Sequence, residues 1–476
     1  MIDPSRRNKL DFSNKRLVFF YIIFLGIMVF YIYKLFTIQI INGDYYLELA
    51  DENRISIVKE QTTRGIIYDR NGVVLARNVP TYDIVITPAE LPEDEGDIQN
   101  IYRKLSALID IPVNKGVIND ETVRLYNECS PDFGITQTVY IASSLSPYKQ
   151  TGIKCDVDEK TAMEIQELSS EMPGVSVRVN SIREYPTGYD TSEIIGFLGP
   201  IPDLISDEME ERGFILDKDK YGYGGVESSL QDILSGKNGR RVVEVDVAGL
   251  EMRDLEPPKE PVPGYNIKLT IDVRLQQVAR AALIDTMNFY NNISVTGPIT
   301  YDGAAIAMNP KTGEILAMVS EPTYDNNRMT RYIPAYYYQQ LSMDQSKPLM
   351  NHAIQVAQPP GSVFKIVTGI GSINEKVVAP EYYVHCPGNI FVTQSYSPND
   401  PGSQQEYVCH LRTGHGQVDY IHALAWSCNI YFNKVGGGYQ NEVPEGLGID
   451  RLGQYAHALG YGEYSGIELD GEEDGL

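Results

Sequence analysis

The sequence predicts one N-terminal membrane-spanning helix followed by two domains that each mix helices and strands. A single long apolar run lies near the N-terminus, at residues 17–37. Short alternating segments and helix-like segments then follow one another up to a proline-rich stretch at residues 257–264, and the same mixture resumes after it. A chain of 476 residues is long enough for two or more domains, each with its own core.

The N-terminal segment has the charge pattern of an uncleaved membrane anchor. Residues 1–16 carry five basic and two acidic side chains, and Lys34 is the one charged residue in the apolar run. A cleaved signal peptide is the alternative, but the run is long for one and no small-x-small cleavage site follows it. The basic flank places residues 1–16 in the cytoplasm and the chain after about residue 38 outside the membrane.

The overall charge excludes some classes of partner. The formal net charge is −24 at pH 7. Such an acidic surface disfavours nucleic acid as a partner, because phosphate groups bind basic surfaces.

Local patterns place the expected elements on either side of the proline-rich stretch, which we interpret as an interdomain linker. Before it we expect strands at 66–68 and 82–86 and helices at 100–108 and 161–172. After it we expect a strand at 266–271, a helix at 274–289 and a hairpin made of 303–308 and 314–319. The hairpin turn contains Lys311, Thr312 and Gly313.

A Ser-x-x-Lys motif at Ser362 and Lys365 is the first candidate for chemistry. Two prolines precede it and an apolar segment follows, so we expect a helix that begins near Gly361 or Ser362. Residues i and i+3 share a helix face, which brings the lysine amine to the serine hydroxyl. We expect Val363, Phe364, Ile366 and Val367 to bury the helix, desolvate the amine and lower its pKa, so that it can act as a general base.

A Ser-x-Asn motif at Ser427 and Asn429 supplies complementary groups. It follows a helix-like segment at 418–425, and it offers a hydroxyl for proton relay and an amide that can hold a substrate amide. The chain repeats both spacings at Ser146 to Lys149 and at Ser397 to Asn399, but proline and polar neighbours make these segments loops.

Cysteine and histidine raise two further possibilities. An exported chain can form disulfides, and Cys386 and Cys409 bracket a loop-rich stretch that a bridge would close. The pairs His385-Cys386 and Cys409-His410 also suggest zinc, but neighbours on a strand point to opposite faces, so four such ligands converge poorly. We therefore predict no metal site and no cofactor. His415 is expected to be a structural hydrogen-bonding residue near Ser427, and Cys428 to pack inward.

Together these motifs make the chain resemble class B penicillin-binding proteins, the D,D-transpeptidases that cross-link peptidoglycan, and in particular those similar to penicillin-binding protein 2. Further segments resemble boxes of that family and occur in family order: 64–72, 183–186 with 195–199, 222–227 with 234–239, 269–276 and 309–318.

The resemblance implies the following domain organisation. Residues 1–16 are a cytoplasmic tail, 17–37 a transmembrane anchor, and 38–262 a non-catalytic α+β pedestal or dimerisation domain with a head insertion at about 80–180. Residues 263–476 are an α/β transpeptidase domain similar to serine β-lactamases, with an antiparallel sheet flanked by helices. A buried ionic network is expected among five residues of the pedestal boxes: Arg64, Asp69, Arg70, Arg183 and Glu227.

The family also has a third catalytic box, Lys-Thr/Ser-Gly, on a strand after the Ser-x-Asn box. No such box follows Asn429, and the Lys-Thr-Gly at Lys311 precedes the nucleophile and fits a hairpin turn. We therefore expect the transpeptidase domain to lack its C-terminal part, which leaves the activity of this polypeptide open.

By resemblance, Ser362 is the nucleophile, Lys365 its base, Ser427 a proton relay and Asn429 a substrate-binding amide. The implied partners are peptidoglycan stem peptides, β-lactams, a membrane glycan polymerase and other wall-synthesis proteins at the bacterial membrane. Three alternatives stay open: a β-lactam sensor or β-lactamase, a catalytically deficient scaffold that activates a wall polymerase, and a D,D-carboxypeptidase that uses water as the acceptor.

Overall fold

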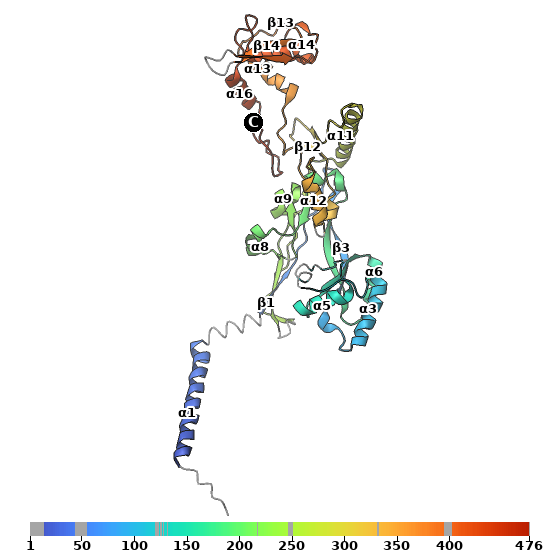
Figure 1. Cartoon of the computed structure of the whole chain (residues 1–476), viewed down its shortest axis with the longest axis vertical. Helices are drawn as coiled ribbons and strands as arrows, with labels where there is room; N and C mark the ends of the chain where they lie inside the picture. Colours follow the sequence, from blue (N-terminus) through green and yellow to red (C-terminus); the bar gives the residue numbers. More distant parts are fainter. Residues whose placement is uncertain are drawn as a thin grey trace, which may run out of the picture.

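The structure is a computed structural model of the whole chain, shown in Figure 1. It describes residues 14–42, 55–119, 123, 126, 128–130, 132–216, 218–245, 251–330, 333–394 and 402–475. The predicted cytoplasmic tail therefore lies almost wholly outside the described residues, as does the Ser397 to Asn399 repeat of the Ser-x-Asn spacing.

The N-terminal helix α1 covers Asn14–Phe36 and continues into a π-helical turn at Thr37–Ile41. Within the described residues, Phe19–Ile41 is the one helical stretch long and apolar enough to cross a membrane, with a mean hydropathy of 2.1. Its large apolar side chains are exposed in the isolated chain, as a lipid-facing helix requires.

The pedestal is built on two sheets. β1 (Ile55–Glu60), β8 (Gly239–Val245) and β9 (Glu251–Asp254) form an antiparallel three-stranded sheet. The second sheet has five strands: β2 (Ile67–Tyr68), β3 (Val74–Ile86), β4 (Thr151–Val157), β5 (Val175–Glu184) and β10 (Ile267–Lys268). The long strand β3 pairs with both β4 and β5, and β10 pairs in parallel with β2.

The head of the pedestal packs three helices against β3, β4 and β5. These are α3 (Glu95–Ile109), α5 (Ile135–Leu145) and α6 (Glu159–Glu167), which share one apolar core with the strands. Asp94 and Asp158 cap α3 and α6 by accepting hydrogen bonds from backbone N–H groups in the first turn. A disulfide joins Cys129 to Cys155 here, a pairing that the sequence did not indicate.

Short elements connect the head to the rest of the chain. They are α7 (Ser192–Ile195), β6 (Phe197–Gly199), α8 (Ser206–Glu211), β7 (Tyr221–Tyr223), α9 (Gly225–Ser229) and α10 (Gln231–Leu234). The proline-rich segment after β9 does not run free as a linker. Lys259 and Val262 form β-bridges with Arg240 and Lys237, because this backbone lies along the pedestal.

The predicted ionic network is smaller than expected. The buried Glu227 carboxylate binds the Nε of Arg64 at 2.5 Å and the Nε of Arg183 at 2.8 Å. Asp69 instead accepts backbone N–H bonds from Asn71, Val73 and Val273, because it caps the turn after β2 and the start of the next domain's first helix.

Arg70 is also outside the network, because it points to a half-exposed carboxylate, that of Glu314, at 3.8 Å. Two of the five expected residues therefore serve other contacts.

The C-terminal half begins with helix α11 (Val273–Ile293), which packs on the antiparallel pair β11 (Gly303–Met308) and β12 (Ile315–Glu321). Lys311, Thr312 and Gly313 lie in the turn between these strands, as predicted. The remaining elements are α12 (Ala335–Met343), α13 (Lys365–Asn374), β13 (Val384–Cys386), β14 (Asn389–Gln394), β15 (Ser403–Val408), β16 (Gly416–Val418), α14 (Tyr420–Ala425), α15 (Asn429–Gly437) and α16 (Ile449–Ala458). In Figure 1, α13 to α16 gather at the end opposite the head.

Breaking the Glu227 network should destabilise the pedestal strongly. Removing a carboxylate that compensates two buried guanidinium groups leaves unpaired buried charge, so Glu227→Ala should lower the free energy of unfolding by about 3–5 kcal/mol. Glu184→Ala is the matched control, because its ion pair with Arg77 is half-exposed and should cost at most about 1 kcal/mol. Urea denaturation of the chain in detergent measures both changes. Equal losses from the two variants would contradict the assigned role of Glu227.

Candidate active site

The Ser-x-x-Lys motif lies where a short helical turn becomes a longer helix. A 3₁₀ turn at Gly361–Phe364 runs directly into α13, whose first residue is Lys365. Gly361 adopts a φ of +57°, a left-handed conformation that glycine tolerates, as the chain leaves Pro360. This geometry brings the Nζ of Lys365 to 3.1 Å from the Oγ of Ser362. The contact that the i, i+3 spacing predicts is therefore present.

The burial of this helix is more one-sided than the sequence suggested. Val367 is 1% exposed, whereas Val363 and Ile366 are 61% and 46% exposed. The apolar sequence could not show this, because its periodicity does not say which face meets the core. Ser362 itself is exposed, so its hydroxyl can be reached from outside.

The Ser-x-Asn motif closes over the amine of Lys365. Ser427 lies in the turn between α14 and α15 with a φ of +51°, and Asn429 is the first residue of α15. The Nζ of Lys365 lies 2.8 Å from both the Oγ and the carbonyl oxygen of Ser427, and 2.6 Å from the Oδ1 of Asn429. The Oγ of Ser427 also donates to the Oγ of Ser362 at 3.0 Å. All four candidate residues therefore meet at one point.

These contacts suit a neutral lysine. Two of the four neighbours of Nζ, the Ser427 carbonyl and the Asn429 Oδ1, can only accept hydrogen bonds. They can take the two N–H groups of a neutral amine, which leaves its lone pair for the Ser362 hydroxyl, since the Ser427 hydroxyl donates to Ser362. Burial lowers the pKa of Lys365 despite the opposing effect of the Cys409 and Cys428 thiols, which favours this neutral form.

Asn429 is held on both sides by the protein. Its Oδ1 accepts from Lys365, and its Nδ2 donates to the carbonyl oxygen of Val408 at 3.1 Å. It therefore positions the lysine, and the second lone pair of its Oδ1 can accept from a further donor.

The Ser146 to Lys149 repeat of the first motif does not form such a site. Ser146 ends α5 in the head, and Lys149 lies in the turn that follows. Proline at position 147 ends the helix, so the two side chains do not share a helix face.

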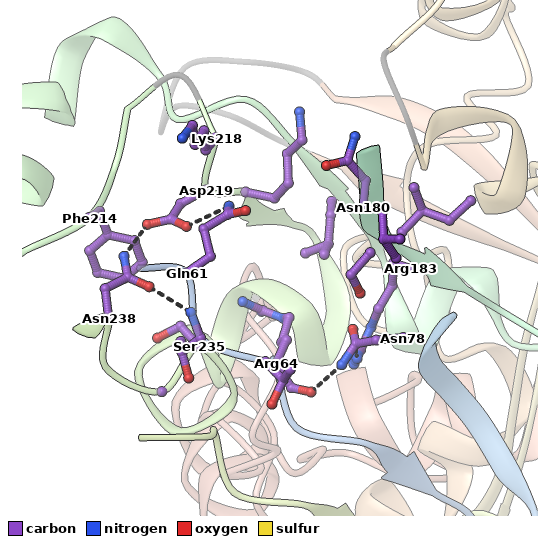
Figure 2. A pocket seen from close by; sticks show the side chains of 18 of the residues that line it. Gln61, Arg64, Asn78, Asn180, Arg183, Phe214, Lys218, Asp219, Ser235 and Asn238 are labelled. Atoms are coloured by element: carbon purple, nitrogen blue, oxygen red, sulfur yellow. Dashed lines mark hydrogen bonds between the residues drawn. The ribbon is translucent and has the colours of Figure 1, made fainter. Parts of the chain in front are cut away.

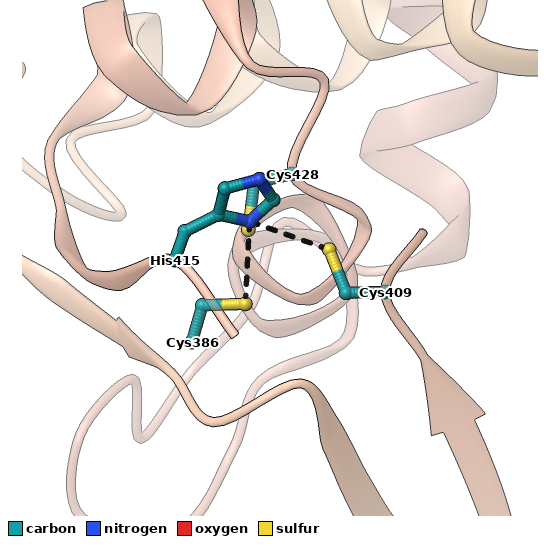
Figure 3. A group of neighbouring side chains, drawn as sticks. All are labelled: Cys386, Cys409, His415 and Cys428. Atoms are coloured by element: carbon teal, nitrogen blue, oxygen red, sulfur yellow. Dashed lines mark hydrogen bonds between the residues drawn. The ribbon is translucent and has the colours of Figure 1, made fainter. Parts of the chain in front are cut away.

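A second cluster lies directly behind the Ser427 turn and bears on the possible Cys386–Cys409 bridge and on the question of a metal site. Cys386 and Cys409 are free thiols and do not form the possible bridge. Instead, their sulfur atoms lie together with Cys428 Sγ and a ring nitrogen of His415, all within 4.8 Å of one another (Figure 3). His385 and His410 are not members of this group, although the Nδ1 of His410 lies 3.9 Å from Cys409 Sγ at its edge.

The donor set fits zinc. Zn–S and Zn–N bond lengths with tetrahedral angles place sulfur and nitrogen about 3.6 Å apart. The Nδ1 of His415 lies 3.6 Å from Cys386 Sγ and 3.5 Å from Cys409 Sγ. Three cysteines and one histidine would occupy all four positions of a tetrahedral ion, so the metal would have a structural role and no open position for water.

The thiols differ in how readily they would ionise for a metal. Burial raises the pKa of Cys409, but backbone N–H groups, including those of Asn429 and Ile430, outweigh this and hold the pKa below its ordinary value. Burial raises the pKa of Cys428 to about 12, so binding of a metal must displace its proton. The sequence does not reveal this site, because His415 and Cys428 come from separate turns, without a ligand-spacing motif between them.

The paired motifs meet in a domain that follows the pedestal along the chain, and comparison with known families identifies both parts. The family model for the penicillin-binding protein dimerisation domain matches residues 59–269, and that for the penicillin-binding protein transpeptidase domain matches residues 303–476. The chain belongs to the penicillin-binding proteins, as the resemblance indicated.

Curated relatives extend this likeness along the chain. The peptidoglycan D,D-transpeptidase MrdA of Salmonella typhimurium (strain SL1344) is 29% identical over 454 residues, which are 95% of this chain and 64% of the relative. Stage V sporulation protein D of Bacillus subtilis (strain 168) is 28% identical, over 97% of this chain and 59% of the relative. The chain thus spans less than two thirds of the length of these relatives.

Solved structures show the same fold. The complex between penicillin-binding protein PBP2 and MreC from Helicobacter pylori matches with a TM-score of 0.64 and 21% identity, covering 89% of this chain and 69% of that chain. A peptidoglycan synthase complex, described as coordinating polymerisation and cross-linking, matches with a TM-score of 0.61 and 25% identity, covering 97% of this chain and 70% of that chain.

The cysteine and histidine cluster should bind one zinc ion per chain. Elemental analysis of the chain purified in detergent should give a zinc ratio near one, and a strong chelator should lower the melting temperature. His415→Gln should lose the zinc, whereas His422→Gln, a nearby exposed histidine outside the cluster, should keep it. Undiminished zinc in His415→Gln, or none in the unaltered chain, would contradict the site.

Proposed function

We propose that this chain is a peptidoglycan D,D-transpeptidase that works through an acyl-serine intermediate. The observation that supports this most directly is the convergence of Ser362, Lys365 and Ser427, in which one amine contacts both hydroxyls. The MrdA relatives carry the same activity in their names.

Each residue then has a defined role. The lone pair of Lys365 takes the Ser362 proton as the Oγ attacks the carbonyl between the two terminal D-alanines of a donor stem peptide. The C–N bond breaks, and Ser427, which bonds both Ser362 and Lys365, passes a proton to the leaving amine of D-alanine. Asn429 holds the amine in place and offers its Oδ1 to a substrate N–H.

An amine of a neighbouring stem peptide then attacks the carbonyl of the acyl-enzyme and gives a proton to Lys365. The ester C–O bond to Ser362 breaks, the new amide bond completes the cross-link, and Lys365 returns the proton to the Oγ of Ser362. Water as the acceptor would give the D,D-carboxypeptidase reaction at the same site. A β-lactam would acylate Ser362 by the same first step, because its strained amide takes the place of the D-alanyl-D-alanine bond.

The assembled site favours an enzyme over a catalytically deficient scaffold. A scaffold would not need the amine of Lys365 to be held by two carbonyl oxygens and two hydroxyls. The long pedestal also favours a penicillin-binding protein over a β-lactamase or a sensor. The relatives are longer than this chain, and in the family a Lys-Thr/Ser-Gly box recognises the substrate carboxylate.

We place the protein at the plasma membrane, anchored by α1 with its N-terminus in the cytoplasm and its bulk outside. The Cys129–Cys155 disulfide supports an oxidising compartment for the pedestal. The solved relatives were studied with MreC and within a peptidoglycan synthase complex. A glycan polymerase and other wall-synthesis proteins are therefore the proposed partners.

Penicillin provides the direct test of the nucleophile. Intact-mass spectrometry of the chain in detergent should show one added penicillin, mapped to the peptide that contains Ser362. Ser362→Ala should abolish the adduct, and Ser146→Ala, which alters the other Ser-x-x-Lys sequence, should retain it. An adduct that persists in Ser362→Ala, or its absence from the folded unaltered chain, would refute the assignment.

The base can be tested through pH. Because Lys365 must be neutral to accept a proton, the acylation rate should rise with pH through the Lys365 pKa, which lies below the ordinary lysine value of 10.5. An arginine at this position stays protonated and cannot accept a proton, so the rate in Lys365→Arg should fall by about 10²–10⁴-fold. Lys376→Arg, an exposed lysine just after α13, is the control. A pH-independent rate would argue against lysine as the base.

A further inference from the structure

A cleft in the pedestal is lined by cations, although the chain as a whole is strongly acidic. The cleft has a volume of about 950 Å³, and eight lysine or arginine residues and two acidic residues line it. The whole chain has 40 basic and 64 acidic residues. A cleft focuses the field of the charges on its walls, so this cleft attracts anions to an otherwise anion-repelling protein.

The two walls come from different parts of the pedestal. Figure 2 shows Asn180, Arg183 and Asn78 from β5 and β3 on one side, facing Lys218 and its neighbours on the other. Cations on both walls repel each other across the opening. A bound anion would contact both walls and remove that repulsion.

The ion pairs within the protein do not neutralise all of the positive charge at the floor of the cleft. Arg64 and Arg183 share the single carboxylate of Glu227. Arg183 is 3% exposed, and its Nη2 has no hydrogen-bond partner in the described part of the chain. The Nη2 atom is itself buried, so this guanidinium adds its positive charge to the floor of the cleft rather than a direct contact with a ligand.

The rim of the cleft adds three lysines. Lys149 lies on the head side, and Lys218 and Lys237 lie on the other side. All three are exposed, and none makes an ion pair with a described residue. Their charge is therefore available to a ligand, and replacing them should leave the fold intact.

We propose that this cleft binds peptidoglycan itself, through the carboxylates of its stem peptides. Gln61 and Asn180 also line the cleft; their amide N–H groups donate to Asp219 and Asp83, and their amide oxygens can accept from the hydroxyls and amides of a ligand. The volume is at the upper end for small-molecule sites, which matches a disaccharide with its peptide rather than a single small anion.

The choice of ligand rests on the proposed function, since that function makes peptidoglycan the substrate. A glycan strand repeats its disaccharide-peptide unit, so one strand can occupy the cleft and the Ser362 site at once. Holding the strand in the pedestal raises the effective concentration of its other stem peptides at Ser362. The cleft would thus retain the polymer between successive cross-links.

Binding of a fluorescent disaccharide-tetrapeptide to the full chain in detergent tests this. The triple variant Lys149→Gln, Lys218→Gln, Lys237→Gln should raise the Kd about tenfold at low salt, as the loss of three exposed ion pairs predicts. The control triple variant Lys160→Gln, Lys268→Gln, Lys311→Gln removes equal charge from exposed sites outside the cleft and should change the Kd less than about twofold. Ser362→Ala in every sample prevents acylation, so the result is independent of catalysis.

Two probes separate this ligand from others. The same muropeptide with its carboxylates amidated should bind about tenfold more weakly, and a salt concentration of about 300 mM should weaken binding of the charged form. Absence of binding, or equal loss in the two triple variants, would overturn the proposal. So would a hexaglutamate peptide that binds the cleft as tightly as the muropeptide, since the cleft would then be a site for acidic protein segments. Penicillin acylation by the cleft variant with Ser362 intact reports separately on the proposed function.

Discussion

The arrangement of the candidate active site depends on one amine that is shared among four oxygen atoms. The Nζ of Lys365 contacts Ser362 from its own helical segment and Ser427 and Asn429 from a segment more than sixty residues further along. Two of these oxygens belong to carbonyl groups and accept hydrogen bonds from the N–H groups of the amine. These two hydrogen bonds determine the direction of its lone pair. The packing of α13 against α15 therefore matters for chemistry, because a shift between the two helices would turn the lone pair away from the serine hydroxyls.

In the pedestal, too, one charged group is shared by side chains from distant segments. The carboxylate of Glu227 binds Arg64, which precedes β2, and Arg183, at the end of β5, so one buried charge fixes three distant segments. Such a network adds little net stability compared with an apolar core, but it permits one arrangement of its members and excludes others. The same pair of arginines also forms the floor of the cationic cleft. The arginines that hold these segments of the pedestal together are therefore also those that would attract an anionic ligand to the cleft.

The sequence predicts what local geometry determines and misses what depends on distant contacts. The contact between Ser362 and Lys365 follows from helical spacing, and the hairpin at Lys311 follows from its turn residues. The meeting of Ser427 with Lys365 needs the family resemblance, because no spacing rule links the two segments. The argument from the sequence against a metal site does not cover the cluster that includes His415 and Cys428, because it assumes that the ligands come as neighbouring pairs. Each strand end supplies only one ligand, and the other two come from turns.

The two clusters meet at the Ser427 turn, where the backbone is under strain. A non-glycine residue in the left-handed region costs about 1–2 kcal/mol, and Ser427 adopts this conformation at a φ of +51°. Its carbonyl oxygen is held from one side by Lys365, and the next residue, Cys428, is fully buried on the other side among the thiols. Relaxing the turn would therefore break the contact with the amine and expose the Cys428 side chain to water. The position of the Ser427 hydroxyl is determined from both sides, so a metal bound at Cys428 would act on the chemistry through the backbone and through its charge, because the thiols already influence the pKa of Lys365.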